Sequence, residues 1–163
     1  MFRVEPLDKA HDRESFDCGD EALNTFIRKY AGQQQRRFLS RVYVALDTDN
    51  RMAGFYTLST ASVEFDAAPD ALKRHLAPYP IPAALIGRLA VDRRYRGQGA
   101  GRHLLAHALT NVRRVAAIAG VAAVVVDAKN AEAATFYQRF GFMPFSDGGM
   151  RLFYPVSALT PPH

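Results

Sequence analysis

The chain has 163 residues, 48% of them hydrophobic, and a formal net charge of +5 at pH 7. This length and apolar fraction predict one globular domain over residues 1–163 and exclude a largely disordered chain. The single cysteine, Cys18, excludes an internal disulfide. The sequence shows no signal peptide and no apolar run long enough to cross a bilayer, so we expect a cytoplasmic protein without membrane contact.

The first half of the chain predicts a helix, a hairpin and an irregular loop. Residues 20–33 place apolar side chains on one helical face, with acidic residues in the first turn. Residues 41–46 and 52–63 read as two strands joined by turn residues. Prolines then bound an irregular segment, 67–82, in which a helix near 70–76 is possible. We expect this segment to be a substrate-side loop.

The second half alternates strands and helices. A strand over 83–91 leads through a glycine-rich turn into a helix over 101–119, whose apolar stripe includes Ile118 and which Gly120 is expected to cap. The uninterrupted apolar run 121–126 predicts a strand covered on both faces. Asn130 is expected to cap a helix that runs through Arg139 and ends at Gly141. Residues 142–145 and 151–154 predict a last strand pair.

The most informative stretch is 88–105, RLAVDRRYRGQGAGRHLL. Gly97, Gly99 and Gly101 remove side chains that would keep backbone N–H groups away from a phosphate. The start of the following helix adds unpaired donors and a positive dipole end, and Arg96 and Arg102 flank the turn with charge. Arginine's planar fork also suits phosphate recognition. The stretch therefore predicts a cradle for an anion.

The spacing of these glycines separates the possible kinds of turn. Gly101 is followed by Arg102-His103 rather than Lys-Ser/Thr, which argues against a nucleotide-hydrolysing P-loop, and the dinucleotide spacing Gly-x-Gly-x-x-Gly is also absent. Residues 96–100, RGQGA, instead resemble the pyrophosphate-binding signature of GNAT-type N-acetyltransferases. An ordinary glycine-rich turn is the alternative for this motif taken alone.

A second stretch, 124–142, VVVDAKNAEAATFYQRFGF, resembles the same family in its strand, its Asn/Asp-x-x-Ala helix start and its Phe-Tyr-x-x-x-Gly-Phe end. Together with the order of elements, it extends the resemblance over nearly the whole chain. The implied fold is α/β (α+β), the GNAT fold. Its mixed, mostly antiparallel central sheet is flanked by helices and has a V-shaped splay between the two central parallel strands.

The resemblance implies acetyl-CoA as co-substrate and no metal. Its pyrophosphate would lie on the glycine turn, and its pantetheine amides would pair with the exposed backbone edge of the preceding strand, where an N–H near Val91 could stabilise the oxyanion. Asn130 would contact the pantetheine arm, cap the helix, or do both. The coenzyme-binding residues implied are Leu89, Ala90, Val91, Arg96, Gly97, Gln98, Gly99, Ala100, Gly101, Arg102, Asn130, Ala133 and Phe136.

Tyr137 is the candidate catalytic residue. The family places a tyrosine hydroxyl near the coenzyme sulfur at this point of the helix, and a phenol with a pKa near 10 is protonated at neutral pH and can protonate the departing thiolate. The alternative is an aromatic core residue beside Phe136 and Phe140. On the catalytic interpretation, Phe136 packs inward and Tyr137 has a hydroxyl to place.

Four stretches resemble one branch of the family, the TacT-like toxins of bacterial toxin–antitoxin operons: FDCG at 16–19 followed by Leu23, GFYTLS at 54–59, IGRLAVD at 86–92 and VDA at 126–128. This resemblance implies acetylation of the α-amine of aminoacyl-tRNA, which blocks translation. It also implies a ribbon-helix-helix antitoxin as partner, and a homodimer.

Basic side chains and amine chemistry agree with an aminoacyl-tRNA acceptor. An α-amine with a pKa of about 7.7 to 8.0 is partly neutral at pH 7, whereas a lysine amine near 10.4 needs a base. Glu64 and Asp66 are conceivable bases, but exposed loop carboxylates are the simpler interpretation. Two basic tracts could hold an RNA backbone, or be solvated faces: Arg28, Lys29, Arg36, Arg37 and Arg41, and Arg93, Arg94 and Arg96.

Two other functions stay open at this stage. The chain could be a GNAT enzyme that acts on a small-molecule or protein amine, or a non-catalytic domain that binds acetyl-CoA or nucleic acid. His103 and His107 lie one turn apart, as a metal pair would, but no third ligand is nearby. We therefore expect both to be surface residues on the solvent side of their helix.

Overall fold

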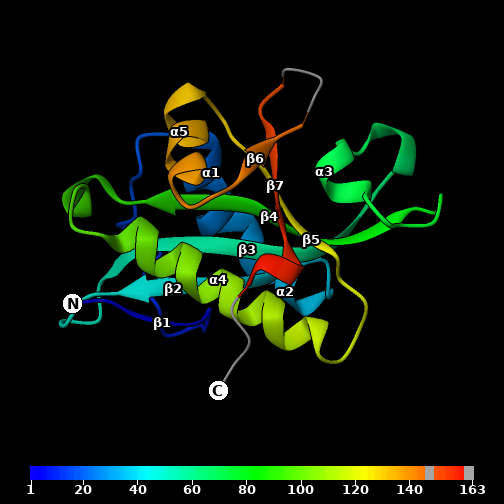
Figure 1. Cartoon of the computed structure of the whole chain (residues 1–163). Coiled ribbons are helices and arrows are strands. Elements are labelled where there is room, and N and C mark those ends of the chain that lie inside the picture. Colours follow the sequence, from blue (N-terminus) through cyan, green and yellow to red (C-terminus); the bar gives the residue numbers. More distant parts are fainter. Residues whose placement is uncertain (146–148, 160–163) are drawn as a thin grey trace. The chain divides into compact units, whose positions relative to one another are not determined.

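The computed structural model describes residues 1–145 and 149–159 and contains a mixed sheet flanked by helices (Figure 1). Strands β4 and β5 pair in parallel, and the pairs β1/β2, β2/β3, β5/β7 and β6/β7 are antiparallel. The strand order is β1-β2-β3-β4-β5-β7-β6. The strands are β1 (Arg3–Pro6), β2 (Arg41–Leu46), β3 (Met52–Val63), β4 (Ile81–Val91), β5 (Ala123–Asp127), β6 (Met143–Pro144) and β7 (Arg151–Pro155). The mixed, mostly antiparallel sheet predicted from the sequence is confirmed.

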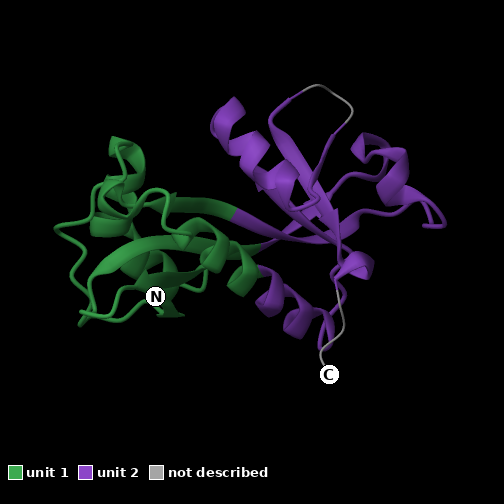
Figure 2. Ribbon diagram, turned by 60° about the vertical axis from the view of Figure 1, so that its left-hand side comes forward, with its two compact units in different colours: residues 1–59, 87–108 green, residues 60–86, 109–163 purple. Residues whose placement is uncertain are grey.

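The chain forms two compact units, which Figure 2 colours separately. Unit 1 comprises residues 1–59 and 87–108, and unit 2 comprises residues 60–86 and 109–163. Strands β3 and β4 and helix α4 (Ala100–Ala116) each contribute residues to both units. The glycine turn therefore belongs to unit 1, and the helix with Tyr137 belongs to unit 2.

In unit 1, one helical segment packs on one face of the strands. It consists of α1 (Glu21–Thr25), a π-helical turn (Phe26–Tyr30) and α2 (Ala31–Arg36). It begins where the Asp20 side chain accepts hydrogen bonds from the amides of Ala22 and Leu23 at 3.0 and 3.3 Å. Its buried residues pack with alternate residues of the strands, so this helical face fixes one side of the sheet. The shared core includes Phe26, Ile27, Ala31, Val42, Val44, Phe55 and Ala90.

The opposite face of the strands in unit 1 meets helix α4. A Cβ at Gly54 would lie 2.6 Å from the Ala90 carbonyl oxygen and 2.9 Å from a Leu104 methyl carbon, so only glycine permits this close approach. The Tyr56 hydroxyl lies 2.8 Å from Nδ1 of His107. The prediction that His107 is a surface residue is wrong, because its ring also contacts the Tyr43 ring.

In unit 2, β5 lies between β4 and β7. Its register with β4 runs from Ala83↔Ala123 to Ile86↔Val126, and its register with β7 from Ala123↔Pro155 to Asp127↔Arg151. Residues 123–126 are fully buried, as the uninterrupted apolar run predicts. The core of this unit also takes in the short helix α3 (Asp70–Lys73) through Leu72.

The predicted hairpin of β2 and β3 is confirmed at both ends, whereas several other boundaries differ. Strand β1 was not predicted, because four residues give too short a pattern. Helix α4 ends at Ala116, so Gly120 is not its cap and does not adopt a left-handed conformation, and Ile118 is exposed rather than part of the apolar stripe. The last predicted turn, over 146–149, lies mostly outside the described residues.

Candidate active site

The glycine turn of unit 1 has the backbone geometry that an anion cradle requires. Gly97 and Gly99 have φ of +77° and +86°, a region that L side chains rarely adopt. A Cβ at either position would meet no atom within 4 Å, so both glycines face open space. The first hydrogen bond at the start of α4 runs from the amide of His103 to the carbonyl of Gly99 at 3.1 Å. The amides of residues 100–102 therefore have no acceptor within the helix or elsewhere in the described part of the chain, and they are free for an anion.

A buried carboxylate, Asp92, fastens this turn. Its side chain is 1% exposed and accepts hydrogen bonds at 3.0 Å from Nε and Nη2 of Arg94. It also accepts from the amides of Arg94 and Asp17, both at 2.9 Å. Burial alone would raise the pKa of Asp92, but these hydrogen bonds outweigh it and the pKa is lowered. The role of Asp92 could not be predicted from the sequence, since a single Asp after a strand gives no signal of its own.

The loop at residues 16–19 lies against the same turn. Nη2 of Arg96 donates to the Cys18 carbonyl at 2.8 Å, and the amide of Arg93 donates to the Asp17 carbonyl at 2.9 Å. Gly19 has φ of +87°, and a Cβ there would lie 3.1 Å from Nε of Arg93. Two of the arginines predicted to attract an anion are thus also tied to this loop. The FDCG motif is explained as a support of the turn.

The backbone of residues 89–91 continues β4 beyond its parallel pairing. Among the described residues, the parallel pairing of β4 with β5 ends at Ile86. Strand β4 itself continues to Val91. Leu89 and Val91 are half-buried and Ala90 is buried. A strand segment that runs past its parallel partner is what the predicted splay requires, and it leaves backbone groups for an extended ligand.

In unit 2, Tyr137 is a buried phenol on helix α5 (Ala131–Arg139). Its side chain is 6% exposed and its ring contacts those of Phe136 and Phe142 at centroid distances of 5.2 and 5.5 Å. Within the described residues the hydroxyl has no hydrogen-bond partner. Burial raises the pKa of Tyr137, so the phenol holds its proton at neutral pH. Tyr137 is more deeply buried than Phe136, which reverses the expected order of the two rings.

The start and the end of α5 are both fixed by local hydrogen bonds. Asn130 is the N-cap, and its side-chain oxygen accepts from the amide of Ala133 at 2.8 Å. Beyond the helix, Gly141 has φ of +98° and the amide of Phe142 donates to the Tyr137 carbonyl at 3.2 Å. The predicted cap and stop of this helix are both confirmed. The cap occupies the Asn130 oxygen only, so its amide hydrogens are available for a second contact.

The predicted basic tracts are only partly available to a polyanion. Arg28 donates to the Phe16 carbonyl, and its Nε is buried, so it supports the fold. Lys29, Arg36, Arg37 and Arg41 are exposed. Glu64 and Asp66 are exposed loop carboxylates, which is the simpler of the two interpretations given to them.

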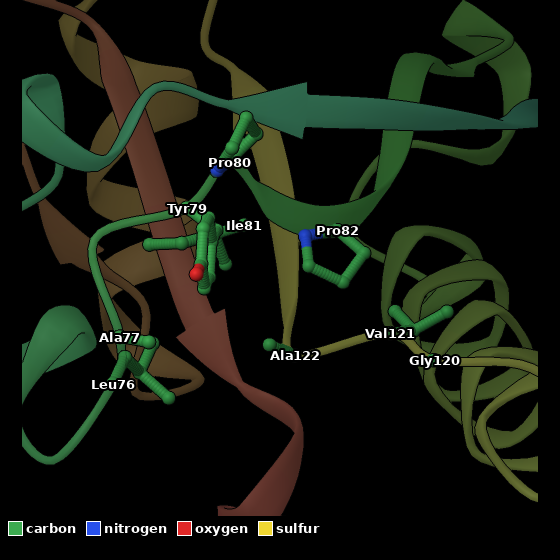
Figure 3. Close-up of a pocket in the computed structure, with 9 residues that line it drawn as sticks. All are labelled: Leu76, Ala77, Tyr79, Pro80, Ile81, Pro82, Gly120, Val121 and Ala122. Carbon is green, nitrogen blue, oxygen red and sulfur yellow. The ribbon is translucent and has the colours of Figure 1, made fainter.

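One open hollow of about 410 Å³ lies in unit 2 (Figure 3). Figure 3 shows the ring of Pro82 and the side chains of Tyr79 and Val121 around it. The hollow is mostly apolar and includes none of the residues predicted to bind coenzyme or to transfer a proton. Its lining residues are Leu76, Ala77, Tyr79, Pro80, Ile81, Pro82, Gly120, Val121 and Ala122.

Residues 1–145 and 149–159 contain no cluster of three or more His, Cys, Asp or Glu side chains that could hold a metal ion. In the same ranges, none of the helices has the length and apolar character needed to cross a bilayer. His103 is exposed and contacts the Phe2 ring, at a centroid distance of 5.8 Å. The two histidines therefore have separate aromatic neighbours.

Comparison with known proteins identifies relatives along most of the chain. The acetyltransferase (GNAT) domain family matches residues 38–144. A tRNA-acetylating toxin of Mycobacterium tuberculosis (strain ATCC 25618 / H37Rv) is 38% identical over 83% of this chain and 81% of the relative. A probable toxin TacT of Sinorhizobium fredii (strain NBRC 101917 / NGR234) is 31% identical over 96% of this chain and 92% of the relative.

Solved structures of toxins are also similar to this chain over most of its length. AtaT complexed with acetyl-methionyl-tRNAfMet is similar with a TM-score of 0.88 and 33% identity, covering 97% of this chain and 96% of the other. A mutant AtaT toxin with one tyrosine replaced by phenylalanine, bound to the C-terminus of the antitoxin AtaR and acetyl-CoA, has a TM-score of 0.81 and 32% identity, covering 96% and 94% of the two chains.

Proposed function

This chain belongs to the GNAT acetyltransferase family, in the branch of the TacT-like toxins, and we propose that it acetylates the α-amine of aminoacyl-tRNA and so blocks translation. One observation carries this proposal: the glycine turn that would hold the coenzyme occurs in a chain 38% identical to a tRNA-acetylating toxin. The similarity to AtaT in complex with acetyl-methionyl-tRNAfMet supports the same acceptor.

Acetyl-CoA is the donor, and it supplies a thioester whose acetyl group an amine can attack. We propose that the free amides of residues 100–102 and the exposed turn around Gly97 and Gly99 bind its pyrophosphate. The backbone of residues 89–91 binds the extended pantetheine arm. Arg96, Gln98 and Arg102 flank the turn, and Asn130, Ala133 and Phe136 complete the coenzyme-binding set.

Tyr137 is the proposed general acid. The neutral amine forms a bond to the thioester carbon and makes a tetrahedral oxyanion, which the amide near Val91 stabilises. Collapse of this intermediate breaks the C–S bond and expels a thiolate, and the nitrogen gives up its extra proton to solvent. A phenol kept protonated by burial, whose hydroxyl has no hydrogen-bond partner in residues 1–145 and 149–159, is suited to protonate that leaving group. An α-amine is partly neutral at physiological pH, so the chain needs no strong base, in keeping with the exposure of Glu64 and Asp66.

The remaining partners follow from the branch. We propose that the protein is neutralised by a ribbon-helix-helix antitoxin, and the structure of mutant AtaT bound to the C-terminus of its antitoxin AtaR supports an antitoxin partner. We further propose a homodimer as the active form. Charged tRNA is a substrate found in the cytoplasm, and that is where we propose the protein acts.

The proposal is tested by following labelled acetyl from acetyl-CoA into a mixed pool of charged tRNA. Label is expected on charged tRNA, none on uncharged tRNA, and little with the Tyr137→Phe protein. Mass spectrometry of the released amino acid should then place the acetyl group on the α-amine. Label on a small amine or on protein, with none on charged tRNA, would show a GNAT enzyme with another acceptor.

A further inference from the structure

Arg88 of unit 1 is an arginine that has an aromatic partner and no anionic one. Its guanidinium carbon lies 3.7 Å from the centroid of the Phe26 ring, and the residue is half-buried. Within residues 1–145 and 149–159, no carboxylate, carbonyl or hydroxyl accepts a hydrogen bond from it. Arg94, six residues on, is in contrast held by both oxygens of Asp92 at 3.0 Å.

The stacking on Phe26 prepares Arg88 to bind an anion. The ring covers one face of the guanidinium plane and fixes its orientation, while the N–H groups on the edge of that plane keep their hydrogen-bonding capacity. Burial lowers the pKa of Arg88, yet an arginine keeps its charge at neutral pH. A partly desolvated cation without a counter-ion is unfavourable in the free protein. Binding of a phosphate removes that cost and forms two charge-assisted hydrogen bonds.

The position of Arg88 on β4 associates it with the acceptor. It directly precedes residues 89–91, the backbone proposed to bind the pantetheine arm. Alternation along the strand puts Arg88 on the same face as Ala90, which packs with Phe26 in the core of unit 1. The coenzyme's pyrophosphate already has the glycine turn as its partner. The 3′-phosphate of the coenzyme lies beyond the pyrophosphate, at the far end from the pantetheine arm proposed for residues 89–91, so the anion left for Arg88 is on the acceptor.

We propose that Arg88, oriented by Phe26, binds the phosphodiester that joins the terminal aminoacylated nucleoside of charged tRNA to the preceding nucleotide. In such an acceptor, this phosphate is the first anionic group along the covalent chain from the reacting amine. The inference rests on the proposed function and adds a specific contact to it. The Arg88 guanidinium bound to this phosphate positions the end of the RNA. It therefore raises kcat/KM for charged tRNA and leaves coenzyme binding unchanged.

The test uses charged tRNA in two forms, natural or with this one phosphodiester replaced by an uncharged methylphosphonate. For the wild-type protein, loss of the charge should lower kcat/KM about tenfold or more, as expected for a charge-assisted hydrogen bond. For the Arg88→Gln protein, kcat/KM should be low for both forms, and the two values should agree within about twofold. Arg88→Lys should recover part of the difference, because it restores the charge but not the fork.

Three controls keep the outcome specific. Arg51→Gln, an exposed arginine of the β2–β3 turn, should keep the wild-type response to the methylphosphonate. Acetyl-CoA affinity and thermal stability of Arg88→Gln should match the wild type. If kcat/KM of the Arg88→Gln protein still falls tenfold with the methylphosphonate tRNA, or if this protein loses acetyl-CoA affinity instead, the inference is overturned and the proposed function is not affected. A wild-type protein that acetylates neither form contradicts the proposed function, and this inference with it.

Discussion

The turn in unit 1 and the helix end in unit 2 are positioned by different forces. The turn around residues 92–102 is held by charge-assisted hydrogen bonds that converge on the buried Asp92 carboxylate. Helix α5 is held by its caps and by contacts between aromatic rings, and the hydroxyl of its buried Tyr137 has no hydrogen-bond partner among the residues that the structure describes. The turn thus holds backbone N–H donors whose geometry is fixed by polar hydrogen bonds. Helix α5 holds one hydroxyl proton, that of Tyr137, in an apolar environment.

This difference matches the two tasks proposed for the regions. Binding a pyrophosphate requires several N–H groups in a fixed arrangement, which a turn can hold only if its own polar groups are paired elsewhere. Donating a proton requires one group whose pKa stays above neutrality, and an apolar environment ensures that. Substitutions in the two regions should therefore affect different measurements: coenzyme affinity and stability for the turn, and turnover for Tyr137.

The largest effect is expected for Tyr137→Phe, which removes one hydroxyl without changing the ring packing. If Tyr137 is the general acid, kcat should fall by about 10² to 10⁴, the usual contribution of such a group. Acetyl-CoA affinity and thermal stability should stay close to wild type, since the hydroxyl makes no hydrogen bond within the described residues. Steady-state kinetics with charged tRNA, calorimetric titration of acetyl-CoA and thermal unfolding measure the three quantities.

Tyr154→Phe is the matched control, because it removes a phenol hydroxyl from the same unit. The Tyr154 ring packs against Phe142, at a centroid distance of 5.4 Å. This variant should keep wild-type kcat. If Tyr137→Phe also keeps it, Tyr137 is an aromatic core residue, and the thiolate leaves without its help.

The next largest effect is expected for Asp92→Asn. Asparagine keeps one acceptor oxygen, but its NH2 group would replace the other and would face the two donors bound there, one N–H of the Arg94 guanidinium and one backbone amide, in a buried position. We expect a loss of about 2–3 kcal/mol of unfolding free energy at pH 7. Asp127→Asn breaks a pair of the same geometry with Arg151, but both side chains are about half exposed, so it should cost less than about 1 kcal/mol.

The effect of Asp92→Asn should also depend on pH. Because the folded pKa of Asp92 is lowered, its carboxylate contributes stability above the unfolded pKa of about 3.9, and this contribution is lost as the pH falls through the folded value. The difference between wild type and variant should therefore be constant between pH 5 and 7 and shrink below about pH 4. Urea unfolding at several pH values measures it, and an unchanged difference at low pH would exclude Asp92 as the source.

Much of the site's local structure could be predicted from the sequence, because it depends on short patterns. The cap at Asn130, the stop at Gly141 and the left-handed Gly97 and Gly99 each follow from a residue's own conformational preference, whereas Asp20, predicted in the first turn of its helix, is the N-cap before it. The β2–β3 hairpin is signalled by the turn residues between the two strands. In these places the local chemistry and the final structure agree.

The contacts that join distant segments could not be predicted in the same way. Asp92 accepts from the amide of Asp17, 75 residues away, and Arg96 donates to the carbonyl of Cys18, 78 residues away. The aromatic partners of His107 are Tyr56 on β3 and Tyr43 on β2. The spacing of His107 from His103 along the helix carries no information about these partners. Such contacts depend on packing between elements, and local propensity carries no information on them.

A smaller effect is expected for Gly99→Ala, which tests the backbone of the turn. The added Cβ would meet no atom within 4 Å, so the cost arises from the left-handed φ of +86° alone. This is about 1–2 kcal/mol, and acetyl-CoA affinity should fall about five- to thirtyfold if the turn shifts to avoid it. Gly120→Ala also adds a Cβ in open space, without a left-handed φ, and should leave affinity unchanged. Equal affinities for the two variants would contradict the cradle.

The smallest effect, and the one that separates two roles of a single residue, is expected at Asn130. Asn130→Ala removes the cap on Ala133 and should cost about 1 kcal/mol of stability. Asn130→Asp keeps the capping oxygen but removes the amide hydrogens, so stability should stay near wild type. If those hydrogens bind the pantetheine arm, acetyl-CoA affinity should fall in Asn130→Asp by about three- to tenfold, the equivalent of one hydrogen bond. Unchanged affinity in a stable Asn130→Asp protein would leave Asn130 as a helix cap alone, without a contact to the pantetheine arm.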